Sequence, residues 1–221
     1  TDLIAACAQT GKALNIKKGQ FVSPADIALA VQKAQSFGAT DVLLTERGTS
    51  FGYRDLVVDM RGLREMRRAA PVCFDATHSA QLPGAGDGVS AGDREMVAPL
   101  ARAAVAVGID ALFVEVHSNP VEAPCDGLCQ LTPPALERLL YEVLRIAAAL
   151  ESHLRHHLHD HDSDSAHRLG DGRRPHPPTH PRRRYAAVHL ARDPLLPCGG
   201  HRTAAGSGKR GVPRGLRPHK T

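Results

Sequence analysis

Apolar residues in the first 150 positions form short runs that alternate with longer segments of helical period. Short runs bounded by turn residues are typical of strands in a buried parallel sheet. They predict four strands, at residues 14–17, 42–45, 72–75 and 111–116. Helical spacing with capping signals predicts three helices, at residues 24–37, at residues 93–107 and from residue 132 onward. This alternation predicts an α/β protein.

Each predicted strand is followed by polar or charged side chains at its carboxyl end. These are Lys17, Arg47, His78, and Glu115 with His117. Because the carboxyl ends of parallel strands meet at one edge, where α/β barrels keep their active sites, we expect these side chains to share a site. Strands that only support the fold do not need such groups.

Five motifs in fixed order carry a resemblance to a known family. They are NIKKGQFVSP, TERGTSFGYRDLVVDMR, FDATHSAQLPG, RAAVAVGIDALFVEVH and the CDG at residues 125–127. Over residues 1–150 the chain resembles 3-deoxy-D-manno-octulosonate 8-phosphate synthase, also called 3-deoxy-8-phosphooctulonate (KDO-8-phosphate) synthase or 2-dehydro-3-deoxyphosphooctonate aldolase. The synthase that opens the shikimate pathway uses a similar barrel, but FDATHSAQLPG favours the octulosonate branch.

The resemblance implies a (β/α)8 TIM barrel of the class I DAHP synthetase type. A closed barrel takes about 250 residues and eight strands. Four strands in residues 1–150 therefore predict only the last four βα units, the C-terminal half of the barrel domain. The chain also begins at Thr1 without a methionine, which suits a fragment. We expect the fragment alone to be inactive.

The resemblance also assigns substrate contacts. It implies that Lys17 and Arg47 meet phosphoenolpyruvate, with Arg47 on its phosphate, and a planar guanidinium suits that group. Taken alone, each cation would more often be an ordinary surface charge. The expected catalytic residues are Lys17, Arg47 and His78, and the expected substrate-binding residues are Lys17, Gln20, Arg47, Phe51 and Gln81.

A divalent metal is the expected cofactor. By the resemblance, His78, Glu115 and Asp126 are its ligands, together with a cysteine that would precede Thr1, and this nitrogen and oxygen set suits zinc, iron or manganese. TERGTSFGY and ATHSAQLPG resemble the metal-dependent branch, whereas CDGLCQL matches neither branch. The metal-independent branch stays open, and a lone histidine at a strand end is more often structural.

Two loops have simpler alternatives. The glycine-rich stretch at residues 81–92 is a surface connection by composition, and the resemblance implies a lid over the sugar phosphate. Cys125 and Cys129 have zinc-like spacing, but a second pair is lacking, so we interpret them as loop thiols.

Charge divides the chain in two. The net charge of +5 is the sum of −3 for residues 1–150 and +8 for residues 151–221, and the second part holds 11 of the 13 histidines. Its histidine, arginine and proline runs predict a disordered tail, which we interpret as an out-of-frame translation. Only Tyr185 could stack on bases, so specific nucleic-acid binding has little support.

The resemblance implies a transferase that condenses phosphoenolpyruvate with D-arabinose 5-phosphate and water, for lipopolysaccharide biosynthesis. The full-length parent would be a homo-oligomer, a tetramer. Five cysteines without scaffold spacing, no apolar run long enough to span a bilayer and no signal peptide predict a cytoplasmic protein without membrane contact. The alternative is an inactive truncated remnant whose basic tail binds polyanions without specificity.

Overall fold

A parallel sheet forms the centre of the protein. The structure, a computed structural model, describes residues 1–51, 55–83, 91–164 and 185–190, with side chains up to residue 152. Within these ranges the sheet has five strands in the order β1-β2-β5-β8-β9. They are β1 (Leu14–Lys17), β2 (Val42–Glu46), β5 (Val72–Asp75), β8 (Ala111–Val116) and β9 (Tyr185–Leu190). The four predicted strands are confirmed, and β2 is one residue longer than predicted.

The register aligns the carboxyl ends of the strands. Lys17 lies opposite Thr45, Thr45 opposite Cys73, and Cys73 opposite Ala111. All four strands run in the same direction, so the segments that leave them emerge along one edge of the sheet. This edge is where the predicted site residues follow their strands.

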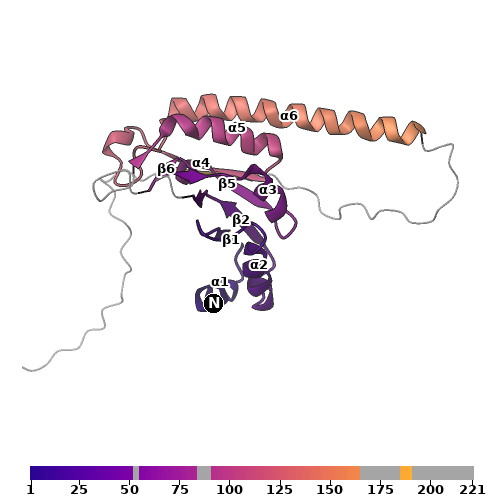
Figure 1. The fold of residues 1–221 in the computed structure, drawn as a ribbon, viewed down its shortest axis with the longest axis horizontal. Helices are drawn as coiled ribbons and strands as arrows, with labels where there is room; N and C mark the ends of the chain where they lie inside the picture. Colours follow the sequence, from indigo (N-terminus) through magenta and orange to yellow (C-terminus); the bar gives the residue numbers. More distant parts are fainter. Residues whose placement is uncertain (52–54, 84–90, 165–184, 191–221) are drawn as a thin grey trace, which may run out of the picture.

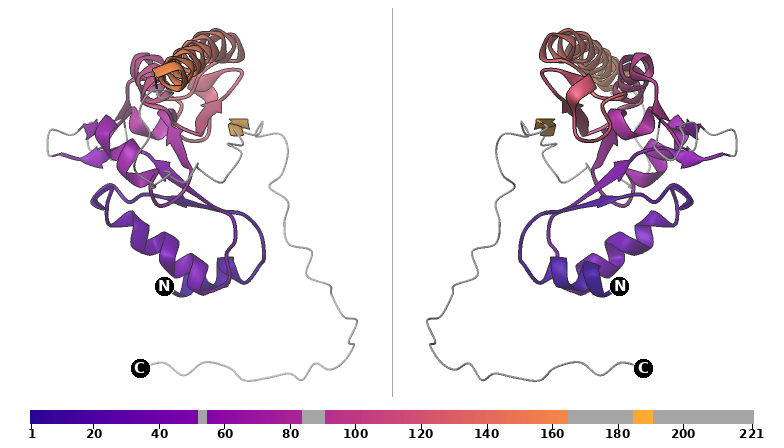
Figure 2. Two further views of the ribbon diagram at one scale, coloured as in Figure 1. Left: turned by 90° about the vertical axis from the view of Figure 1, so that its right-hand side faces the viewer. Right: turned by 90° about the vertical axis from the view of Figure 1, so that its left-hand side faces the viewer.

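Helices pack at both ends of the sheet. They are α1 (Asp2–Ala8), α2 (Ile27–Ser36), α3 (Met60–Met66), α4 (Ala76–Ser79), α5 (Val97–Val107) and α6 (Pro133–Asp164). α5 and α6 lie side by side at one end, and α1 and α2 lie at the other (Figures 1 and 2). The three predicted helices correspond to α2, α5 and α6. The short helices α1, α3 and α4 were not predicted.

Two predicted helix starts differ from the structure. α2 begins at Ile27 rather than residue 24, because Ser23 Oγ accepts the backbone N–H of Asp26 and closes a turn before the helix. The helix predicted from residue 93 begins as a 3-10 turn, η1 (Arg94–Met96), where Asp93 accepts the N–H of Glu95. A polar side chain thus caps η1, whereas α2 has no side-chain hydrogen bond at its N-cap residue, Asp26.

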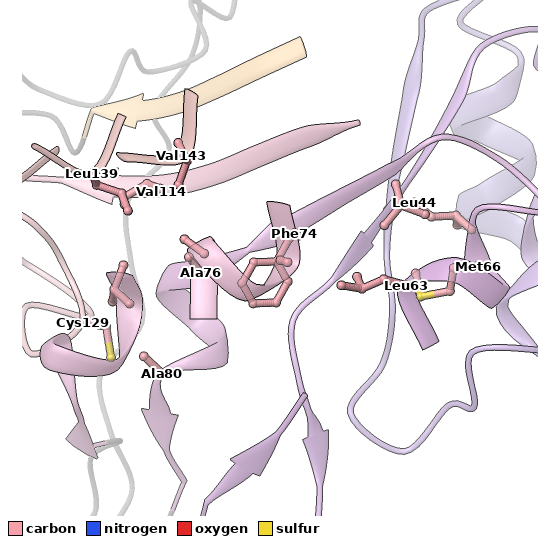
Figure 3. Close-up of a cluster of buried hydrophobic side chains, with 14 of the residues drawn as sticks. Leu44, Leu63, Met66, Phe74, Ala76, Ala80, Val114, Cys129, Leu139 and Val143 are labelled. Carbon is pink, nitrogen blue, oxygen red and sulfur yellow. The ribbon is translucent and has the colours of Figure 1, made fainter. Parts of the chain in front are cut away.

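Apolar side chains of the sheet meet those of the helices in one main core (Figure 3). Leu44 and Phe74 from the strands are fully buried, and so is Met66 of α3. Leu139 of α6 closes the same core from the other end and is 2% exposed. Every second side chain along each strand thus packs against the helices. The side chains between them point to the opposite face of the sheet.

Short hairpins follow two of the strands. β3 (Thr49–Ser50) pairs with β4 (Leu56–Val57) after β2, and β6 (Gln81–Leu82) pairs with β7 (Ala91–Gly92) after β5. A 3-10 turn, η2 (Pro120–Glu122), follows β8. The stretch that we interpret as a lid begins and ends in β6 and β7, and its residues 84–90 lie outside the described part of the chain.

The prediction that residues 151–221 form no regular structure is wrong in two places. α6 continues to Asp164, since residues 151–164 contain neither proline nor glycine to end it. Farther on, all six residues of β9 pair in parallel with β8. The local run YAAVHL is apolar enough to form a strand, and the free edge of β8 offers unpaired backbone groups. Disorder at residues 165–184 and 191–221, which lie outside the described part, stays a prediction.

The described helices are not of the membrane-spanning kind: within residues 1–51, 55–83 and 91–164, none is both long and apolar enough to cross a bilayer.

We predict that Phe74→Ala lowers the free energy of unfolding by about 3–5 kcal/mol, because it removes a fully buried ring and leaves a cavity between sheet and helices. Urea unfolding followed by circular dichroism measures this change. Phe21→Ala is the matched control, since Phe21 is 91% exposed, and its effect should stay within about 0.5 kcal/mol. Equal effects of the two substitutions would contradict the assigned core.

Candidate active site

Charged side chains from four strands converge at the carboxyl edge of the sheet. Lys17 ends β1 and Arg47 directly follows β2. His78 lies on α4, which begins immediately after β5, and Glu115 lies near the end of β8. Asp126 lies in the loop that follows β8 and has a positive φ of 50°, a conformation that aspartate tolerates better than most residues.

His78, Glu115 and Asp126 form a compact group. One ligand atom from each lies within 4.8 Å of the others. His78 Nε2 is 3.5 Å from Glu115 Oε1 and 3.9 Å from Asp126 Oδ2. Two ligands of a tetrahedral ion, each at about 2.0–2.1 Å from it, lie about 3.4 Å apart. The spacing and chemistry of these three side chains therefore fit a divalent cation.

Asp75 organises this group from behind, although it was not predicted as a site residue. Its carboxylate is fully buried, and its Oδ2 lies 2.7 Å from His78 Nδ1 and 2.8 Å from Lys17 Nζ. Oδ1 accepts the backbone N–H of His78 at 2.9 Å. A proton held at Nδ1 by the carboxylate leaves Nε2 as the lone-pair atom that faces Glu115 and Asp126.

Charge and burial act in opposite directions on Asp75. Burial by itself raises the pKa of Asp75, but the hydrogen bonds and charge of His78, with the hydrogen bond from Lys17, outweigh it, so the pKa lies below its usual range. Asp75 is therefore ionised at neutral pH and offers both neighbours a full negative charge. The motif FDATH contained the signal, an aspartate three residues before the histidine at a helix start.

Gln81 connects Arg47, the predicted anion-binding residue, to the group of His78, Glu115 and Asp126. Its Oε1 accepts from Arg47 Nη2 at 2.7 Å, and its Nε2 donates to Asp126 Oδ1. The two contacts together fix the orientation of the amide, because its acceptor faces a cation and its donor faces a carboxylate. Arg47 and Asp126 are thus held in one continuous set of hydrogen bonds.

The remaining predicted substrate residues border this set. Lys17 Nζ lies 4.9 Å from the centroid of the Phe113 ring, and the lysine side chain is 43% exposed. Gln20 Oε1 accepts from Ser50 Oγ at 3.1 Å, which places Gln20 beside β3. Phe51 follows that strand and is 66% exposed. The structure thus links Lys17, Arg47 and Gln81 by contacts with the His78, Glu115 and Asp126 group. Gln20 and Phe51 lie at a neighbouring position.

A buried ion pair that was not predicted supports the loops around Arg47. Lys18 and Glu46 are 1% and 2% exposed, and Lys18 Nζ lies 3.5 Å from Glu46 Oε1. The ammonium group also donates to the carbonyl oxygens of Gly19 and Val22 and to Thr49 Oγ1. Glu46 Oε1 accepts the N–H of Gly48 at 2.7 Å. Gly48 has a φ of +92°, and a Cβ there would lie 2.9 Å from Leu56 Cβ, so the turn after Arg47 requires glycine.

Strand period explains why the two adjacent lysines find different carboxylates. Successive side chains of a strand point to opposite faces. Lys17 reaches Asp75 on the site face, and Lys18 reaches Glu46 on the face that packs against helices. The pair KK in the sequence therefore serves two separate charge pairs.

Gln130 holds the loop that carries Asp126 and was likewise not predicted. Its fully buried amide donates to Glu115 Oε2 at 3.2 Å and to the carbonyl of Cys125 at 2.9 Å. Arg94 donates to the carbonyl oxygens of Gln130 and Gly127. These contacts join the loop to β8 and to η1, so Glu115 and Asp126 are positioned together.

Three other residues were singled out by the sequence, and of these Cys125 lies beside Asp126: burial and the charges of Asp126 and Glu115 raise the pKa of its thiol. His117 Nδ1 contacts the backbone of Asn119, at 2.7 Å from its oxygen and 3.0 Å from its nitrogen. Cys125 is exposed, whereas Cys129 is 1% exposed, and burial raises the pKa of Cys129 to about 11. All four described cysteines are outside disulfides, and the interpretation of Cys125 and Cys129 as loop thiols stays a prediction.

Parallel βα units with a charged site at the carboxyl edge of the strands define part of a (β/α) barrel enzyme. Residues 1–151 match the model of the DAHP synthetase I family. The chain belongs to this family, and the expected family and fold class are confirmed.

Its relatives include several proteins named 2-dehydro-3-deoxyphosphooctonate aldolase. The relative from Desulfotalea psychrophila is 50% identical over 152 residues, which are 68% of this chain and 54% of the relative. The relative from Cyanothece sp. is 54% identical over 151 residues, 68% of this chain and 55% of the relative. The relative from Rickettsia bellii is 55% identical over 141 residues, 63% of this chain and 52% of the relative. The chain spans about half the length of these relatives.

We predict that Lys18→Met lowers the free energy of unfolding by about 3 kcal/mol, because Glu46 would remain buried without its cation. Urea unfolding measures the loss. Adding Glu46→Gln to Lys18→Met should restore part of it, since the unpaired charge is then removed. Lys33→Met, at an exposed lysine of α2, is the matched control and should change stability by less than about 1 kcal/mol. A Lys18→Met protein as stable as the control would contradict the assigned ion pair.

Proposed function

We propose that this chain carries part of the active site of a 3-deoxy-8-phosphooctulonate synthase. Such an enzyme condenses phosphoenolpyruvate with D-arabinose 5-phosphate and water to give KDO 8-phosphate and phosphate. The observation that carries the proposal is the continuous set of contacts from Lys17 through Asp75 and His78 to Asp126, and on through Gln81 to Arg47. This set of contacts brings two positively charged side chains, Lys17 and Arg47, next to three side chains that could hold a metal ion. The names of the relatives support the same activity.

Arg47 and Lys17 bind the phosphoenolpyruvate anion in this proposal. One terminal nitrogen of Arg47 already donates to Gln81, and this contact holds the guanidinium while its other N–H donors serve phosphate. Lys17 is 43% exposed and provides a second positive charge near Phe113. Two oriented cations neutralise the substrate and hold its C3 carbon toward the aldehyde, which lowers the entropic part of the barrier.

His78, Glu115 and Asp126 would hold a divalent cation, with zinc, iron and manganese as the candidates. Their mutual distances and their nitrogen and oxygen donors fit such an ion. A bound cation supplies Lewis acidity that polarises a carbonyl oxygen or activates water. The chain's own contribution is to keep the proton of His78 on Nδ1, where it is donated to Asp75. Nε2 is thereby directed to the two carboxylates.

The remainder of the reaction follows from the chemistry of the substrates. C3 of phosphoenolpyruvate attacks the aldehyde carbon of arabinose 5-phosphate, water adds at C2, and phosphate leaves with cleavage of its C–O bond. Arg47 would balance the charge of the departing phosphate. The product is a precursor of lipopolysaccharide, and the proposal includes a homo-oligomeric parent enzyme.

We predict that Arg47→Ala lowers kcat/KM for phosphoenolpyruvate by about 30-fold or more, equivalent to about 2 kcal/mol, because a charged partner of the phosphate is lost. A chimera supplies the complete barrel for this test: residues 1–151 of this chain replace the matching segment of the Desulfotalea psychrophila relative. Steady-state assays of phosphate release and KDO 8-phosphate formation measure the effect.

Arg61→Ala in the same chimera is the matched control, because the Arg61 side chain is 92% exposed and pairs with Asp59. It should keep the parent kcat/KM. Undiminished efficiency of the Arg47→Ala chimera would remove Arg47 from the site. A folded chimera that forms no product with Arg47 intact would instead favour the rival function, an inactive remnant whose basic tail binds polyanions. The 221-residue chain without the segment from the relative is the blank in both assays.

We predict that a chelator abolishes product formation by the chimera, and that one of zinc, iron or manganese restores it, because the three ligands fit such an ion. Elemental analysis gives the metal content. His78→Gln should lose the bound metal, and His117→Gln should keep it, since His117 contacts the Asn119 backbone instead. Full activity of a preparation shown to be metal-free would assign the chain to the metal-independent branch.

A further inference from the structure

One buried oxygen atom serves two parts of the candidate site. Asp75 Oδ2 is 2.7 Å from His78 Nδ1 and 2.8 Å from Lys17 Nζ. Asp75 is fully buried, so in this arrangement the protein itself provides the partners of that oxygen. An ammonium and an imidazole N–H therefore share the negative charge of a single carboxylate oxygen.

The two partners differ in how firmly they are held. His78 is fixed through its ring and through its backbone N–H, which donates to Asp75 Oδ1. Its side chain is 15% exposed, whereas the side chain of Lys17 is 43% exposed and ends a flexible four-carbon stem. If one of the two partners leaves Asp75 Oδ2, we therefore expect it to be Lys17.

The positive charge of Lys17 partly neutralises the carboxylate of Asp75, which therefore acts less strongly on His78. A carboxylate that accepts from Nδ1 of a histidine raises the basicity of Nε2 and strengthens it as a metal ligand. While Lys17 also contacts Oδ2 of Asp75, this increase in the basicity of Nε2 is smaller. Once Lys17 turns toward another anion, Asp75 interacts with His78 alone, and Nε2 becomes a stronger metal ligand.

We infer that Asp75 is a positioning residue that couples the partner of Lys17 to the metal affinity of the His78, Glu115 and Asp126 group. An anion that engages Lys17 tightens metal binding, and by thermodynamic reciprocity a bound metal favours that anion. The identification of the anion as phosphoenolpyruvate rests on the proposed function. The coupling itself rests only on the geometry of Asp75 and can be measured without substrate.

A double-mutant cycle on the 221-residue chain tests the coupling, with Mn²⁺ as the probe. Lys17→Met imitates removal of the lysine from Asp75, and Asp75→Asn keeps the shape of the side chain without its charge. Free Mn²⁺ is measured by electron paramagnetic resonance. The chain has 11 histidines beyond residue 150, so binding by the His78→Ala variant is subtracted as the blank.

We predict that Asp75→Asn weakens Mn²⁺ binding about ten-fold or more. Lys17→Met should strengthen it about five-fold in the parent chain and less than about two-fold in the Asp75→Asn background. Asp110→Asn is the matched control, because Asp110 pairs with Arg67 at the other end of β8, and it should leave Mn²⁺ affinity unchanged.

Several outcomes would overturn the inference. One is Mn²⁺ binding no stronger than in the His78→Ala blank, and another is an unchanged affinity of Asp75→Asn. An equal effect of Lys17→Met in both backgrounds would show simple repulsion between lysine and metal, without a role for Asp75. Because no substrate enters the cycle, the chimera can fail to form product while the coupling stands.

A second measurement avoids the Asp75 substitution, in case that variant does not fold. In the metal-free chain labelled with nitrogen-15 at histidine, the proton on His78 Nδ1 should resonate farther downfield in Lys17→Met than in the parent, because its hydrogen bond to Asp75 becomes stronger. The resonance is assigned by its absence in His78→Ala. An unchanged position would contradict the coupling.

Discussion

The parallel register of β1, β2, β5 and β8 is the constraint on which the site depends. It sets Lys17, Thr45 and Cys73 side by side, so segments distant in the chain leave the sheet at one edge. Because successive side chains alternate between faces, a slip of one residue in β1 would turn Lys17 and Lys18 each to the opposite face. Only one of the two carboxylates, Asp75 or Glu46, would then still face a lysine. Hydrophobic packing behind the sheet thus determines which charges meet in front of it.

The carboxylates in and behind the candidate site are balanced in two different ways. Asp75 and Glu46 each lie next to a lysine ammonium, so their charge is largely neutralised within the protein. Glu115 and Asp126 accept instead from glutamine amides, which satisfy hydrogen bonds without cancelling charge. Negative charge therefore persists around His78. That distribution of charge favours a cation at this group and suits the rest of the edge to anions.

Periodicity and capping signals predicted the strands and the long helices, because these elements depend on local spacing of apolar residues. The resemblance brought His78 and its two carboxylate neighbours together, but Asp75, Lys18 and Gln130 were missed. Their roles arise from contacts between segments far apart in sequence, which no local pattern records. The tail prediction failed at β9 for a different reason: average composition concealed the short apolar run YAAVHL, which pairs along the free edge of β8.

The position of β1 at one margin of the described sheet has a dynamic consequence. In that sheet β1 pairs only with β2, whereas β5 and β8 each pair on both sides. Local opening therefore costs less free energy at β1 than at the central strands. Backbone amides of β1 would exchange with solvent sooner than those of β5, and Lys17 would leave its place while His78 and Glu115 stay in theirs. The residues of the site thus differ in local stability, with Lys17 on the strand that opens first.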